Sequence, residues 1–106
     1  MNKKDELKEL KKSLWHVYGG KCFVANCKRK FGRGSTIHHL SYKQGEKIYS
    51  DFKDPLDYYK YLAPIVCKES HRFIPLCFKH HWIVELLKKY DPETLQQILQ
   101  IVYKSR

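Results

Sequence analysis

The segment PLCFKHHWIVELL, residues 75–87, places a cysteine and two adjacent histidines just ahead of an apolar stretch with helical spacing. Apolar residues recur in it at intervals of three and four, which predicts a helix that begins near Phe78. We expect the buried stripe of this helix to consist of Ile83, Leu86, Leu87 and Tyr90. The helix would therefore carry a core face and, at its start, side chains able to bind a metal ion.

Two short strands are predicted on the N-terminal side of this helix. The segment HRFIPLC, residues 71–77, predicts one strand, in which Pro75 must lie at a sheet edge or at an end. The segment STIHHLSYK, residues 35–43, predicts the other, because β-branched residues lead into a second histidine doublet. Both doublets then lie next to predicted strand or helix ends.

Two more helices are predicted around these elements. Asp54 is a plausible N-cap and Pro55 a first helical residue, so a helix should start there and end early, at Pro64. Asp91-Pro92 should break the helix that contains the second doublet and cap a last one over 92–104. The inner face of that last helix is expected to consist of Leu95, Ile98, Leu99 and Val102.

A charged, amphipathic helix is predicted over residues 3–18, ended by Gly19 and Gly20. It has no apolar signal core, and the chain has no long apolar run, so we expect no membrane partner and a cytoplasmic location. The predicted elements together indicate an α+β fold. The length of 106 residues suits a single domain, one small enough to be helped by a metal.

The formal net charge is +10, from 21 Lys and Arg against 11 Asp and Glu. This excess favours a polyanionic partner, most simply nucleic acid. A solvated cationic surface is the alternative interpretation.

Four cysteines in a reducing compartment suggest metal-binding thiolates more than disulfides. Cys22 and Cys27 are spaced C-x4-C, and Cys77 and His80 are spaced C-x2-H at a helix start. Two chelating pairs on separate elements are the usual way to build a closed tetrahedral zinc site, so these four residues are predicted to bind a structural Zn²⁺.

Cys67 and His71 form a rival C-x3-H pair, so the four ligands could be drawn from three pairs. We prefer the pair at the helix start because its spacing is tighter. Cys67 is then interpreted as a small buried apolar residue beside Ile65 and Val66.

The remaining doublet residues suggest a second metal. His81 follows His80 by about 100° around the helix, so it points away from the zinc. Neighbours in a strand face opposite sides, so His38 and His39 should have different roles. The economical assignment is that His38 and His81 bind a divalent cation such as Mg²⁺ and that His39 takes a proton from an attacking water. Together these groups could hydrolyse a phosphodiester.

The pattern C-x4-C … HH … LC-x2-HH resembles the HNH endonucleases, the ββα-metal nucleases, in their zinc-containing form. The resemblance implies a two-stranded hairpin packed on a helix with a cation between them, His39 as general base, His38 and His81 as metal ligands, and DNA as substrate. It covers residues 20–90, the zinc-containing core of one domain over 1–106, flanked by an N-terminal helix (1–19) and a C-terminal helix (91–106).

Arg72 stands where the family usually has its middle Asn, which is thought to brace the loop carrying the base. Arginine has donors but no acceptor, so His71 could supply the bracing instead, with Arg72 contacting a phosphate. Some relatives carry a third ligand four residues after His81. Glu85 is at that position, although a solvent-facing role is the preferred interpretation.

Basic residues cluster around the predicted centre, and we expect them to contact DNA phosphates: Lys28, Arg29, Lys30, Arg33, Lys43, Arg72 and Lys79. Tyr58, Tyr59 and Tyr61 could stack on bases but are interpreted as core and rim residues of a helix.

Two other functions stay open: a zinc-stabilised nucleic-acid-binding module without catalysis, and a purely structural or protein-interaction domain. Cutting both strands often needs two active sites, so a homodimer is a further alternative.

Overall fold

The centre of the molecule is an antiparallel hairpin of two four-residue strands, β1 (Thr36–His39) and β2 (Phe73–Leu76). The computed structural model describes residues 2–105. Thr36 lies opposite Leu76 and His39 opposite Phe73, and both predicted strands are confirmed. Pro75 has no backbone N–H to donate. It fits because both strands of a two-stranded sheet are edge strands, so the missing donor can lie on the outer side of β2.

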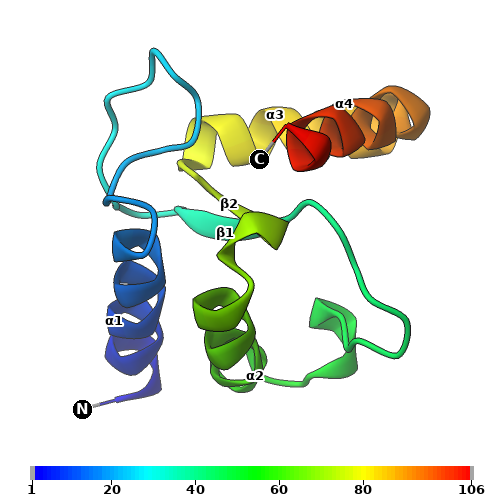
Figure 1. Cartoon of the computed structure of the whole chain (residues 1–106). Coiled ribbons are helices and arrows are strands. Elements are labelled where there is room, and N and C mark those ends of the chain that lie inside the picture. Colours follow the sequence, from blue (N-terminus) through cyan, green and yellow to red (C-terminus); the bar gives the residue numbers. More distant parts are fainter. Residues whose placement is uncertain (1, 106) are drawn as a thin grey trace.

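Within residues 2–105 the chain is a small α+β fold with four α-helices and this one sheet. The helices are α1 (Lys3–His16), α2 (Pro55–Lys68), α3 (Phe78–Tyr90) and α4 (Pro92–Lys104), with short 3₁₀ turns at Tyr49–Asp51 and Ser70–Arg72. Helices α1 and α2 lie on one side of the hairpin and α3 and α4 on the other (Figure 1). None of the helices described is both long and apolar enough to cross a membrane.

The predicted helix boundaries hold except at the end of α1, which was predicted at residue 18 and lies at His16, and at Pro64. Asp54 caps α2 by accepting a hydrogen bond from the Leu56 N–H at 2.9 Å, and α1 ends before Gly19 and Gly20, both at positive φ. The prediction that Pro64 ends α2 is wrong, because the helix continues to Lys68. A proline inside a helix costs roughly 3 kcal/mol, whereas burying a Leu or Val side chain contributes about 1.5–3 kcal/mol each. Leu62 and Val66, on either side of the proline, are fully buried, so continuing the helix is favoured.

The buried stripe of α3 differs from the prediction. Leu86 and Leu87 are partly buried, but Ile83 is 40% exposed and Tyr90 73% exposed, and Val84 packs against the core instead. The helix is rotated so that the face running from His80 through Val84 to Leu87 points inward. In α4 the prediction holds for Leu95, Leu99 and Val102, while Ile98 is 43% exposed.

Trp15 of α1 is fully buried and ties the N-terminal helix to the hairpin, because its indole N–H donates to the Thr36 carbonyl at 2.9 Å. Tyr58 and Tyr59 are buried in the same core, as predicted, and the Tyr59 hydroxyl lies 2.9 Å from Thr36 Oγ1. The core on this side is therefore built by α1, α2 and one edge of β1.

Candidate metal centre

The loop between α1 and β1 carries the first pair of predicted zinc ligands. An antiparallel bridge between Lys21 and Lys30 closes this loop, and the Cys22 N–H donates to the Arg29 carbonyl at 3.1 Å. The Phe23 N–H donates to the Pro75 carbonyl of β2 at 2.8 Å. These backbone bonds hold Cys22 and Cys27 next to the end of β2.

The second pair comes from the start of α3. Cys77 is the N-cap residue, and His80 lies one turn later in the first turn of the helix. Residues three apart in a helix share a face, so both side chains point toward the loop. The Cys77 N–H also donates to Cys22 Sγ at 3.5 Å, which joins the two pairs directly.

The four ligand atoms lie within 4.8 Å of one another, the one such group of three or more His, Cys, Asp or Glu side chains in residues 2–105. Tetrahedral zinc, with Zn–S near 2.3 Å and Zn–N near 2.0 Å, requires ligand separations of about 3.8 Å between sulfurs and about 3.5 Å between sulfur and nitrogen. The separation is 3.9 Å for Cys27 Sγ to Cys77 Sγ, and His80 Nδ1 lies 3.2 Å from Cys77 Sγ and 3.5 Å from Cys22 Sγ.

The chemistry of the donors also fits a metal. A disulfide needs sulfurs about 2.05 Å apart, so Cys27 and Cys77 are free thiols at 3.9 Å. Burial raises the pKa of Cys77, but hydrogen bonds from His80, Cys22 and Cys27 together lower it to about 6. A thiol with this pKa is largely thiolate at neutral pH, the form that binds zinc. The group can therefore hold a metal ion, and three sulfurs with one imidazole are consistent with zinc.

Cys67 and His71 do not join this centre. Cys67 is exposed on α2, so the interpretation of it as a buried apolar residue is wrong. It is not part of the ligand group either. His71 is exposed and stacks on the ring of Tyr103, with 5.9 Å between ring centroids.

The structure separates the two histidines of the β1 doublet, as expected for neighbours in a strand. His38 lies on the α3 side of the hairpin, where His81, Glu85 and Lys88 are among the charges acting on it. Burial lowers the pKa of His38, and the nearby His81 lowers it further. His38 Nδ1 is 2.7 Å from the His39 carbonyl, and His81 Nε2 is 3.3 Å from Glu85 Oε1. These residues share one face without forming a second compact ligand group of three within the described chain.

His39 lies on the opposite face and is only 3% exposed. Its ring stacks on Tyr42 with 3.9 Å between centroids and also contacts Phe73. Its Nε2 lies 3.1 Å from Glu46 Oε1, although the angle is outside that of a hydrogen bond. Burial, together with the positive charge of Arg72, lowers the pKa of His39 to about 4, so the imidazole is neutral at pH 7. Tyr42, which stacks on this ring, is itself 57% exposed.

Arg72 does not contact phosphate, contrary to the prediction, because it is 1% exposed. Its Nη2 donates to both carboxylate oxygens of Glu46, at 2.8 and 2.7 Å, and to the Ser41 carbonyl at 3.0 Å. Nη1 donates more weakly to Glu69, at 3.4 Å. Arg72 therefore braces the loop after β1 itself, using donors alone. Glu46, which was not predicted, lies in a polar loop with no local pattern to mark it.

The other basic residues predicted to contact DNA lie in three different places. Lys28, Arg29 and Lys79 line a hollow of about 390 Å³ beside Cys27 and His80. Lys43 forms an ion pair with Glu69, on the far side of the hairpin loop. Lys30 is exposed on the loop between α1 and β1, and Arg33 lies further along the same loop, facing α1.

No protein-family model, no curated protein and no solved structure matches this chain.

Proposed function

We propose that this chain is a metal-dependent DNA endonuclease of the HNH type with a structural zinc bound by Cys22, Cys27, Cys77 and His80. The observation that carries the proposal is the division of the second doublet. His80 points to the sulfurs, while the adjacent His81, about 100° further around α3, lies 3.3 Å from Glu85 and on the side of the helix near His38. A purely structural zinc module has no need for an imidazole and a carboxylate on the side of α3 near His38.

His38 is suited to be a ligand of the second ion. Its Nδ1 hydrogen bond to the His39 carbonyl fixes the ring and leaves Nε2 as the metal-binding atom. His81 and Glu85 would add one imidazole and one carboxylate from α3. A divalent cation bound there would supply charge stabilisation for the phosphoryl group and its leaving oxygen. A Mg²⁺ ion held by these three side chains would keep water molecules at its remaining positions.

His39 is the proposed general base. Its lowered pKa keeps the imidazole unprotonated at pH 7, the form that a general base requires, but also makes it a weaker proton acceptor than an imidazole with a pKa near 7. Glu46 and Arg72 fix the position of the loop that covers it. Access for the attacking water requires Tyr42, which is exposed and stacked on the ring, to move aside.

The burial of His39 favours a second candidate, a zinc-stabilised DNA-binding module without catalysis. In this alternative His39, Glu46 and Arg72 form a buried structural network, and Lys28, Arg29 and Lys79 supply the DNA contacts.

Plasmid nicking separates the two candidates. We expect the wild-type protein to nick supercoiled plasmid in Mg²⁺ or Mn²⁺, and we expect both His39→Ala and His38→Ala to lose this activity while retaining one zinc per chain. His16→Ala is the matched control, since His16 is exposed on α1. If the wild-type protein binds DNA but cuts it with no divalent cation, the binding module is the correct assignment.

A further inference from the structure

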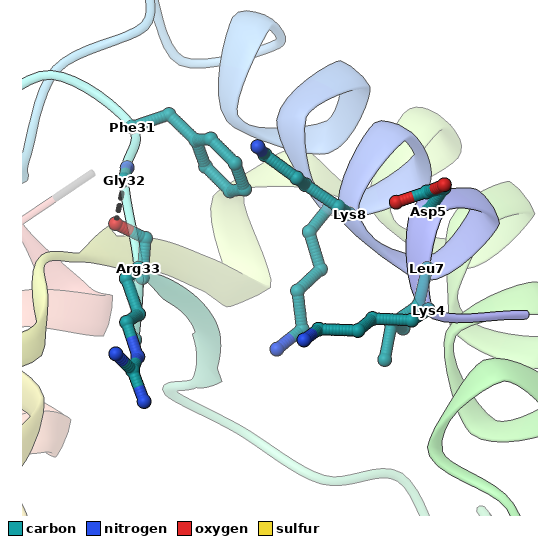
Figure 2. A pocket seen from close by; sticks show the side chains of 10 residues that line it. Lys4, Asp5, Leu7, Lys8, Phe31, Gly32 and Arg33 are labelled. Atoms are coloured by element: carbon teal, nitrogen blue, oxygen red, sulfur yellow. Dashed lines mark hydrogen bonds between the residues drawn. The ribbon is translucent and has the colours of Figure 1, made fainter.

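A cleft of about 530 Å³ lies between α1 and the loop of residues 31–35. Figure 2 shows the side chains of Lys4 and Lys8 extending from α1 toward the loop that carries Arg33, with Phe31 beside them. Lys11 lines the cleft as well. The three lysines follow one another at intervals of four and three, so they form a stripe along one face of the helix.

The charge of this cleft is not neutralised within the protein. Four cationic side chains line it, against the single carboxylate of Asp5. None of the four forms an ion pair with any residue in 2–105, although two other lysines near α1 do: Lys3 pairs with Asp54, and Lys60 pairs with Glu6. Burial lowers the pKa of Lys11, whose ammonium lies over the ring of Tyr59, 5.0 Å from its centroid. An anion in the cleft would therefore meet four cationic side chains that have no ion-pair partner in the described residues.

The loop side of the cleft is held in one conformation. The Gly32 N–H donates to Ser35 Oγ at 3.0 Å, and the Ser35 N–H donates back to the Gly32 carbonyl at 3.1 Å. Gly34 has φ +81° and packs so closely on Phe78 that an added Cβ would lie 2.6 Å from Phe78 Cβ. Arg33, between these anchors, is thus presented from an ordered turn.

We propose that this cleft binds the phosphodiester backbone of DNA, as a second contact surface separate from the basic hollow beside the zinc. Residues 4 to 11 span roughly 10 Å along the helix axis. Successive phosphates of one DNA strand are separated by about 3.4 Å along the duplex axis. The lysine stripe is therefore long enough to contact several phosphates of one strand. The inference rests on the proposed function for its choice of DNA as the ligand.

The test compares two triple variants of equal charge by fluorescence anisotropy with a labelled DNA duplex, in zinc-loaded protein without added Mg²⁺. Lys4→Gln/Lys8→Gln/Arg33→Gln removes the cleft cations, leaving Lys11 because it packs on Tyr59. Lys12→Gln/Lys53→Gln/Lys68→Gln removes three exposed lysines elsewhere. Each phosphate contact contributes about 0.9 to the slope of log K against log salt, so the cleft variant should lose about 3 from this slope. The control should keep the wild-type slope.

Equal losses in the two variants, or no DNA binding by the wild-type protein, would overturn the inference. Plasmid nicking by the same proteins tests the cleft and the nuclease function separately. If the cleft variant binds and cuts DNA as well as the wild type, the nuclease proposal stands and the cleft proposal is wrong. If DNA binding depends on the cleft cations but no protein cuts DNA, the cleft proposal stands and the nuclease proposal is wrong.

Discussion

His80 and His81 are adjacent in the chain but differ by about 100° in direction around α3, so they face different surroundings. His80 Nδ1 lies among three sulfurs, and His81 lies near a carboxylate and His38. One residue of helical offset thus separates the zinc group from the proposed catalytic face. The different directions of His80 and His81 could be predicted from the sequence, because they follow from helix geometry alone.

Replacing Cys77 by Ser should abolish zinc binding, because the thiolate is one of four ligands and its N–H also supports Cys22. The matched control is Cys67→Ser, at an exposed cysteine outside the ligand group. Metal analysis after purification without chelator should give about one zinc per chain for the wild type and the control. Loss of zinc in Cys67→Ser and its retention in Cys77→Ser would show that the ligand set is wrong.

Replacing Glu46 by Ala should destabilise the fold by about 3–5 kcal/mol, because it leaves the guanidinium of Arg72 buried without its main partner. Glu69→Ala removes a longer contact to the same guanidinium from a carboxylate that is partly exposed, so it should cost about 1 kcal/mol or less. Urea unfolding of the zinc-loaded proteins measures both. Similar losses in the two variants would mean that the Glu46 pair is not the buried support described above.

At the scale of elements, the candidate metal centre accounts for the difference between the stripe that α3 buries and the stripe that was predicted. Cys77 and His80 must point toward the loop with the other cysteines, and this fixes the rotation of the helix about its axis. Val84 and Leu87 then face inward, while Ile83 turns to solvent. Hydrophobic periodicity could not reveal this, because several apolar stripes on α3 are nearly equivalent.

Gly34→Ala should destabilise the loop that precedes β1, and Gly45→Ala is its matched control. Both glycines have φ +81°, where an alanine costs about 1–2 kcal/mol, but a Cβ at Gly45 meets nothing within 4 Å. At Gly34 it would clash with Phe78, next to the ligand Cys77. We expect the loss for Gly34→Ala to exceed that for the control by about 1 kcal/mol or more in thermal unfolding. Equal losses would show that the loop can move away from α3.

At the scale of the whole molecule, one small hairpin separates two helical layers, and the zinc group joins the loop after α1 to the start of α3 (Figure 1). Structural zinc contributes on the order of 10 kcal/mol, which is comparable with the whole stability of a small domain, about 5–15 kcal/mol. The metal is therefore expected to decide whether this chain folds.

Removing zinc with a strong chelator at neutral pH should consequently abolish most of the helical circular dichroism signal, and adding zinc back should restore it. Magnesium should not restore it, because thiolate ligands do not suit that ion. A helical signal that survives complete removal of the metal, confirmed by metal analysis, would mean that the apolar core is sufficient by itself.

The sequence alone determined the elements and the Cys/His group that can hold a metal ion. Helix caps such as Asp54, the strand around His38 and His39, and the C-x4-C and C-x2-H pairs are all set by neighbours a few residues apart, where covalent geometry limits the outcomes. Only the tertiary structure decided the rotation of α3, the continuation of α2 through Pro64, and the burial of Arg72 on Glu46. It also placed the lysines of α1 opposite Arg33. These features join residues distant in the chain or balance local cost against core burial, so they depend on how the helices dock, which no local spacing specifies.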